Sequence, residues 1–316
     1  MSTTFDEIVT LLRNVDQEIP PDRVTGLSDL DPDQLSRFSA LWESLPVERR
    51  RSLIQILGEE AYAHVELNFE HACRLALGDP DPVVRQMAID NLWECEDPAL
   101  VNPFLRALTS DVSASVRRSA AAALGQYVLL GEVEQIRPEL LLEIEEGLIA
   151  AGGVGGTPEV RRAALESLGY SSRDEVPDMI RRAYDSSDEP FIRSALVAMG
   201  RSANPVWQPE VQAQIISSAP ALRLAAVQAA GELELTETVP DLVELLDDVS
   251  DEVRRAAIWS LGQLGGDVAR QVLGDLLESS EDTAETQIVQ DALDNLAFVD
   301  GTRDLLMFDL DASDTD

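Results

Sequence analysis

Residues 81–92 read DPVVRQMAIDNL, and this pattern returns in altered spellings along most of the chain. It is best kept at residues 251–262, DEVRRAAIWSLG. Each copy has one position, called position 0 below, that is Arg in the clearest copies. Position 0 falls at residues 50, 85, 117, 161, 192, 223, 254 and 289. The intervals are 31 to 35 residues, with one of 44. A period near thirty-one residues with one helical signature per period predicts a helical repeat array.

The side chains around position 0 predict an amphipathic helix. Apolar residues at −1, +3, +4 and +7 fall on a single stripe of a helical wheel. Position +3 is Ala in seven of the eight copies, which predicts a crowded contact that faces inward. Position +8 is Gly in six copies, and in the five after the leading copy it is predicted to be a helix C-cap. These glycines are Gly125, Gly169, Gly200, Gly231 and Gly262.

Another helix precedes each of these amphipathic helices, for instance at residues 239–246. Asp-rich turns such as 79–82 and 248–251 supply N-cap chemistry between the two. Each unit is therefore expected to be a helix, a tight turn, a second helix that carries position 0, and a connector.

The motif Asp-x-x-Val-Arg-x-x-Ala-x-x-x-Leu-Gly resembles the HEAT repeat, in the short-period form also found in phycobilin lyase subunits. The resemblance covers roughly residues 33–299 and implies an all-α solenoid of about eight helix pairs. Residues 1–32 are then an N-terminal helix, expected at Phe5 to Arg13, and a linker. Residues 300–316 are an acidic tail, with its last positions expected to be disordered. Its apolar cluster, Leu305 to Phe308, is expected to cap the final repeat or to dock on a partner.

The arginines at position 0 are expected to be structural. This position lies at the edge of the apolar stripe, where a guanidinium can bind the Asp of its own or the next unit's turn in a bidentate way. The predicted ladder residues are Arg85, Arg117, Arg161, Arg223 and Arg254. Ile192 and Val289 interrupt it.

The net charge limits the classes of partner that are expected. With 24 basic and 59 acidic residues the net charge is −35, which argues against a nucleic acid partner. All 24 basic residues are Arg, which fits a high-GC genome or, as a second interpretation, a salt-loving host. No signal peptide or membrane-spanning run is seen, so a cytoplasmic protein without a membrane partner is expected.

No residues point to catalysis, a metal or a cofactor. His64 and His71 are predicted to lie on one helix through residues 61–77, about 10 Å apart, too far to share one ion. Cys73 and Cys95 are not predicted to pair. The glycine-rich run 151–158 lacks a following Lys and a preceding strand, so it is interpreted as an insertion that lengthens the helix before it and ends in a loop.

A binding surface is predicted on the outward face of the second helices. Positions +1 and +5 point away from the core and are mostly polar. The exceptions in three adjacent units are Val197, Leu224 and Trp259, and Arg255 flanks Trp259. An exposed Trp with aliphatic neighbours is typical of an interaction hot spot, although Trp259 folded against a neighbouring helix is the alternative. The leading hypothesis is thus a non-enzymatic scaffold that binds a protein on the concave face that the resemblance implies. The alternative is an accessory subunit of a phycobilin-lyase-like or other modifying enzyme.

Overall fold

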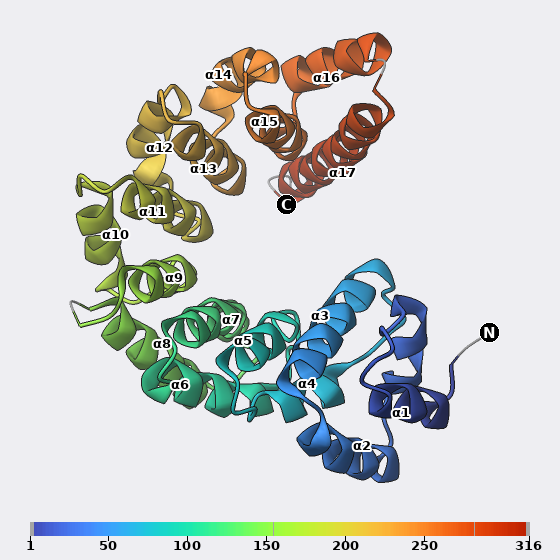
Figure 1. Ribbon diagram of the computed structural model, residues 1–316. Helices are drawn as coiled ribbons and strands as arrows, with labels where there is room; N and C mark the ends of the chain where they lie inside the picture. The colour runs from blue at the N-terminus through green and yellow to red at the C-terminus, as the bar shows by residue number, and fades with distance from the viewer. Residues whose placement is uncertain (1–2, 154, 281, 314–316) are drawn as a thin grey trace. The chain divides into compact units, whose positions relative to one another are not determined.

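A computed structural model describes residues 3–153, 155–280 and 282–313, with side chains described as far as Gly301. The chain divides into two compact units, Met1–Leu168 and Gly169–Asp316, and each is described by itself. All regular structure in the described residues is helical (Figure 1).

Unit 1 begins with one separate helix and continues with four helix pairs. Its helices are α1 (Phe5–Arg13), η1 (Pro21–Leu27), α2 (Pro32–Ser44), α3 (Val47–Ala63), α4 (Glu70–Ala76), α5 (Pro82–Asp90), η2 (Pro98–Leu100), α6 (Val101–Ser110), α7 (Ala114–Glu132), α8 (Pro138–Gly152) and α9 (Pro158–Leu168). The predicted N-terminal helix is confirmed residue for residue. It does not hang free, because the Arg49 guanidinium on α3 donates hydrogen bonds to the carbonyls of Leu11, Asn14 and Gln17.

Unit 2 contributes the other four pairs. Its helices are α10 (Val176–Tyr184), α11 (Glu189–Arg201), η3 (Pro205–Trp207), α12 (Gln208–Ile215), α13 (Pro220–Glu232), η4 (Thr236–Thr238), α14 (Val239–Glu244), η5 (Leu245–Asp247), α15 (Asp251–Leu264), α16 (Asp267–Ser279) and α17 (Thr283–Ser313). Counted over the described residues, the pairs run from α2/α3 to α16/α17, and position 0 lies in the second helix of each. The predicted α-solenoid of about eight pairs is confirmed.

The second helices stack on one another and form the core. Within unit 1, α3, α5, α7 and α9 pack in succession, and α11, α13, α15 and α17 do so within unit 2 (Figure 1). The alanine at +3 is fully buried in all seven copies that have it. These residues are Ala88, Ala120, Ala164, Ala195, Ala226, Ala257 and Ala292. The inward assignment of +3 is therefore confirmed.

The prediction that the +8 glycines are left-handed C-caps is wrong: Gly169 follows the end of α9 without a positive φ, and the other four lie inside their helices. Among the described glycines only Gly265 and Gly266 have positive φ, and Gly265 ends α15. Gly231 instead lies inside α13, where a Cβ would stand 2.9 Å from the Ser260 hydroxyl oxygen. Gly125 likewise faces Ser167 at 2.8 Å. Position +8 therefore lets a second helix approach the small residue at +6 of the next one, where a side chain would push the helices apart.

The predicted helix through residues 61–77 is also wrong, since the chain breaks it into two. α3 ends with His64 in an extended conformation, and α4 starts at Glu70, whose N–H is accepted by the Asn68 side chain. No Gly or Pro marks this break. The Asn68 side chain accepts the N–H of the first residue of the new helix, which favours a turn at this point.

The interval of 44 residues is explained by longer helices. α7 runs on to Glu132 and α8 has 15 residues, as expected for an insertion before the glycine-rich loop. At the other end, α17 continues through position 300 to Ser313, so the expected tail boundary does not coincide with a helix end. The side chains of Leu305 to Phe308 and the final residues 314–316 lie outside what is described, and the expectations for them stay predictions.

Candidate protein-binding surface

Three arginines at position 0 bind an Asp that lies in the following helix pair. Arg85 on α5 donates from Nε and Nη2 to the two Asp111 carboxylate oxygens, both at 2.8 Å. Arg223 on α13 holds Asp248 in the same way, at 2.7 and 2.8 Å. At the start of the array, Arg50 forms an ion pair with Asp79 at 2.7 Å. Each such Arg–Asp ion pair between neighbouring helix pairs is called a rung below.

Each acidic partner stands six residues before position 0 of its own unit, and it also shapes its own turn. Asp111 accepts the N–H of Ser113, and Asp248 accepts that of Ser250. The hydrogen bond from Arg223 lowers the pKa of Asp248, and this outweighs the opposing effect of burial. The Asp248 side chain is only 6% exposed, so the Arg223 guanidinium, and not solvent, balances the charge of its carboxylate.

The other predicted ladder residues bind differently, because position −6 of the following unit is not acidic. Arg117 donates to the Asp111 carbonyl of its own turn, while the next −6 residue is Gly155. Arg161 donates to the Gly152 carbonyl, and Arg254 binds Asp251 and the Asp248 carbonyl. We therefore propose that all five arginines are structural, but only Arg85 and Arg223 form rungs. The sequence signal for a rung was available: Asp stands at −6 only in residues 79, 111 and 248.

The four predicted partner-binding residues lie on three successive second helices of unit 2. Val197 is on α11 and Leu224 on α13, and both are half-buried. Arg255 and Trp259 are on α15 and exposed. Trp259 keeps 47% of its surface accessible, so it is not packed away in the core.

A cavity of about 400 Å³ opens beside Leu224 and adds residues that the pattern did not single out. It is lined by Glu189 and Arg193 of α11, by Pro220, Ala221, Leu224, Ala225 and Gln228 of α13, and by Glu252 of α15. Val197, Arg255 and Trp259 do not line it. Leu224 thus lines a pocket together with two carboxylates and one guanidinium. Trp259 is a separate exposed residue on the neighbouring second helix.

The histidines and cysteines lie elsewhere. His64 ends α3 within 3.8 Å of the Glu60 and Glu66 carboxylates, and His71 is on α4. No group of three or more His, Cys, Asp or Glu among the described residues is arranged to hold a metal ion. Cys73 and Cys95 are unpaired, and burial raises the pKa of the Cys73 thiol to about 12, so it stays protonated. Over the described part of the chain, no helix is both long and apolar enough to span a membrane.

Comparison with known proteins agrees with this architecture. A model of HEAT repeats matches residues 70–140 and 209–294, and the chain belongs to the HEAT-repeat proteins. No curated protein matches it.

Several solved structures have a similar course. YibA of Escherichia coli is 18% identical, covers 89% of this chain and 99% of its own, and has a TM-score of 0.45. The complex of CpcE and CpcF of phycocyanin lyase from Nostoc gives 20% identity, 72% and 94% coverage and a TM-score of 0.49. Human deoxyhypusine hydroxylase gives 16%, 93% and 96%, and a TM-score of 0.38. Because these identities do not exceed 20% and the TM-scores lie below 0.5, any functional inference rests on this chain's own side chains.

Proposed function

We propose that this protein is a non-enzymatic scaffold that binds a protein partner across α11, α13 and α15. The observation that carries this proposal is that the half-exposed Trp259 on α15 and the Leu224 pocket on α13 lie on successive second helices. Large aromatic side chains that keep accessible surface on a packed scaffold are the usual anchors of protein interfaces.

The surroundings of these two anchors suit an interface with a polar rim. Arg193 and Arg255 bring positive charge, whereas Glu189 and Glu252 bring negative charge. Interfaces commonly place such charges around an apolar centre, where they set orientation more than affinity. The alternative, an accessory subunit of a modifying enzyme such as a phycobilin lyase, has no cluster of side chains in its favour among the described residues.

A matched pair of tryptophan variants tests the proposal. Trp259→Ala removes the proposed anchor, and Trp93→Ala removes a tryptophan of unit 1 that is 57% exposed. Both variants, and the wild type, would be used to capture the partner from the native host and then to titrate it once identified. Loss of a hot-spot aromatic weakens binding by roughly 30-fold. We expect that loss for Trp259→Ala only, with melting temperatures within about a degree of wild type for both.

The proposal fails if both variants bind the partner as the wild type does. It also fails if Trp259→Ala lowers the melting temperature by many degrees, because Trp259 would then be a packing residue.

A further inference from the structure

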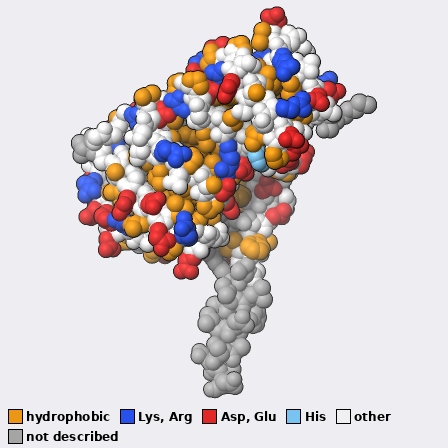
Figure 2. Space-filling view, turned by 90° about the horizontal axis from the view of Figure 1, so that it is seen from below, with side chains coloured by type: hydrophobic (Ala, Val, Ile, Leu, Met, Phe, Trp, Pro, Cys, Tyr) orange, Lys and Arg blue, Asp and Glu red, His pale blue; other side chains and the backbone are white. Residues whose placement is uncertain are grey.

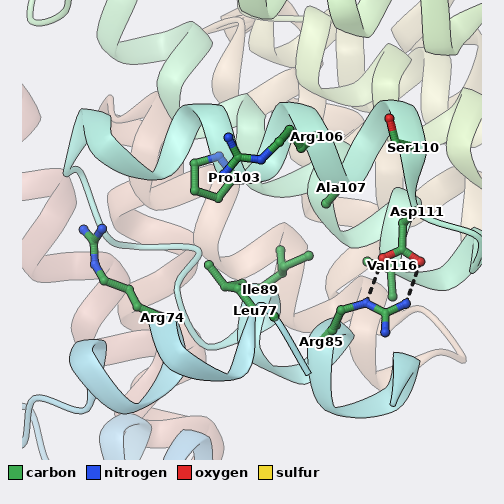
Figure 3. Close-up of a pocket in the computed structure, with 11 residues that line it drawn as sticks. Arg74, Leu77, Arg85, Ile89, Pro103, Arg106, Ala107, Ser110, Asp111 and Val116 are labelled. Atoms are coloured by element: carbon green, nitrogen blue, oxygen red, sulfur yellow. Dashed lines mark hydrogen bonds and ion pairs between the residues drawn. The ribbon is translucent and has the colours of Figure 1, made fainter. Parts of the chain in front are cut away.

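A second hollow lies in unit 1, on the side of the first helices. It has a volume of about 490 Å³ and opens between α4 and α6, with α5 and α7 beneath (Figure 3). Its apolar lining comes from Leu77, Ile89, Pro103, Ala107 and Val116. The end of the seven-residue α4 borders the cavity, where Leu77 and Gly78 line it opposite α6.

The charged residues of this hollow are mostly basic. Three arginines line it, Arg74, Arg85 and Arg106, against a single carboxylate, Asp111. Arg85 and Asp111 neutralise each other in their rung, seen as the dashed pair in Figure 3. The two other guanidinium groups come from different helices, α4 and α6, and lie along the opening (Figure 3).

These two arginines differ in how they are held. Arg74 donates to Glu70 at 2.6 Å and to Asp97, so it is fixed in place but shares its charge. Arg106 is exposed, and no side-chain partner is found for it within the described residues. In the space-filling view from below, basic side chains lie next to apolar ones on the visible face, and acidic ones are scattered among them (Figure 2).

We propose that the hollow between α4 and α6 docks an acidic peptide segment of a partner protein, with an apolar side chain inserted between carboxylates. The apolar lining takes the side chain, and Arg106 at the opening binds a flanking carboxylate. Arg106 selects this occupant, because it is the guanidinium of the lining for which the described residues hold no carboxylate, whereas Arg74 and Arg85 are already paired. This surface is separate from that of α11, α13 and α15, so it stands or falls independently of the function proposed above.

The test uses a fluorescein-labelled peptide of two leucines flanked by two glutamates on each side, titrated into the full chain at low salt and followed by anisotropy. Two companion peptides replace the glutamates by glutamines or the leucines by glycines. We expect saturable binding of the first peptide, weakened at least about tenfold by either replacement, and weakened again as ionic strength screens the charges.

Protein variants locate the site. Arg106→Glu reverses the charge at the opening, and Arg118→Glu makes the same change at an exposed position of α7 outside the hollow. Ala107→Phe fills the cavity without changing charge. We expect Arg106→Glu and Ala107→Phe to weaken binding at least about tenfold and Arg118→Glu to stay within about twofold. Arg106 has no described partner to lose, so Arg106→Glu should melt as the wild type does.

Three results would overturn the proposal: no binding to the wild type, equal loss in Arg106→Glu and Arg118→Glu, or undiminished binding of the glycine peptide. The second would mean general attraction to a charged surface, and the third would mean a site for anions alone.

Discussion

The α7–α9 and α13–α15 junctions use the same packing but differ in one charged contact. In both, the serine at +6 donates to the carbonyl at +4 of the preceding second helix: Ser167 to Ala121 at 2.8 Å, and Ser260 to Val227 at 2.9 Å. In both, the preceding helix offers a glycine at +8 to that serine. Yet Arg223 binds Asp248 across its junction, whereas Arg117 binds the carbonyl of Asp111 in its own turn and the following −6 residue is Gly155. The rung is thus an addition to a register that helix packing sets.

The largest expected effect comes from breaking a rung. Arg223→Met leaves the Asp248 carboxylate buried without its guanidinium, and such a loss typically costs about 3 kcal/mol. Arg117→Met removes one hydrogen bond to a carbonyl and should cost less than about 1 kcal/mol. Chemical denaturation of both variants measures the difference.

A double variant separates the pair from its surroundings. Arg223→Met combined with Asp248→Leu should recover much of the loss, because no unpaired charge is left buried. Equal costs for the Arg223 and Arg117 variants would mean that the rung adds nothing at this junction.

The shared packing is tested at position +3. Ala226 is fully buried on α13, and Ala226→Leu should overpack the contact and cost about 1–3 kcal/mol, with Ala257→Leu similar on α15. Ala221→Leu adds the same atoms at an exposed position of α13 and should change stability by less than about 0.5 kcal/mol. If the Ala226 and Ala221 variants unfold alike, +3 is not the position that sets the spacing.

Acid should weaken rungs in a defined direction. The pKa of Asp248 is lowered in the folded chain, so its contribution is complete above the unfolded value near 4 and is lost as pH falls below that value. Lower pH also relieves the repulsion within this acidic chain, so the melting temperature alone does not isolate the rung.

The informative quantity is the gap in melting temperature between wild type and Asp248→Asn. It should be a few degrees and constant from pH 7 to about 5, then close below about pH 4. Asp275→Asn removes an equal charge at an exposed position of α16 and should show no such closing gap. A gap that widens as pH falls would contradict the lowered pKa.

The sequence predicted those features that each unit expresses by itself. The +3 alanines, the Arg at position 0 and the turn residues carry their own local signals, and the helix pairs followed from them. The sequence-based predictions were wrong where the role of a residue depends on the helix that packs against it. Gly231 near a helix end is locally indistinguishable from a C-cap, and only Ser260 opposite it shows the close approach. The hollow beside Arg106 was missed because its lining comes from four helices, α4 to α7, and is formed only when they pack together.

The smallest expected effect is the installation of the missing rung by Gly155→Asp. Gly155 is exposed, has no atom within 4 Å of an added Cβ and does not need a positive φ, so its backbone accepts a side chain. Residue 155 stands at −6 in the sequence pattern, as Asp248 does, so a register shared as far as this turn would place it opposite Arg117. Gly155→Asn shares the reduced freedom of the unfolded chain but brings no charge. We therefore expect Gly155→Asp to be more stable than Gly155→Asn by about 0.5 kcal/mol at low salt, as for a partly exposed ion pair. The difference should vanish when Arg117→Met is added to both. If aspartate and asparagine are equivalent with Arg117 present, the glycine-rich loop holds residue 155 away from α7, and the shared register ends at helix packing.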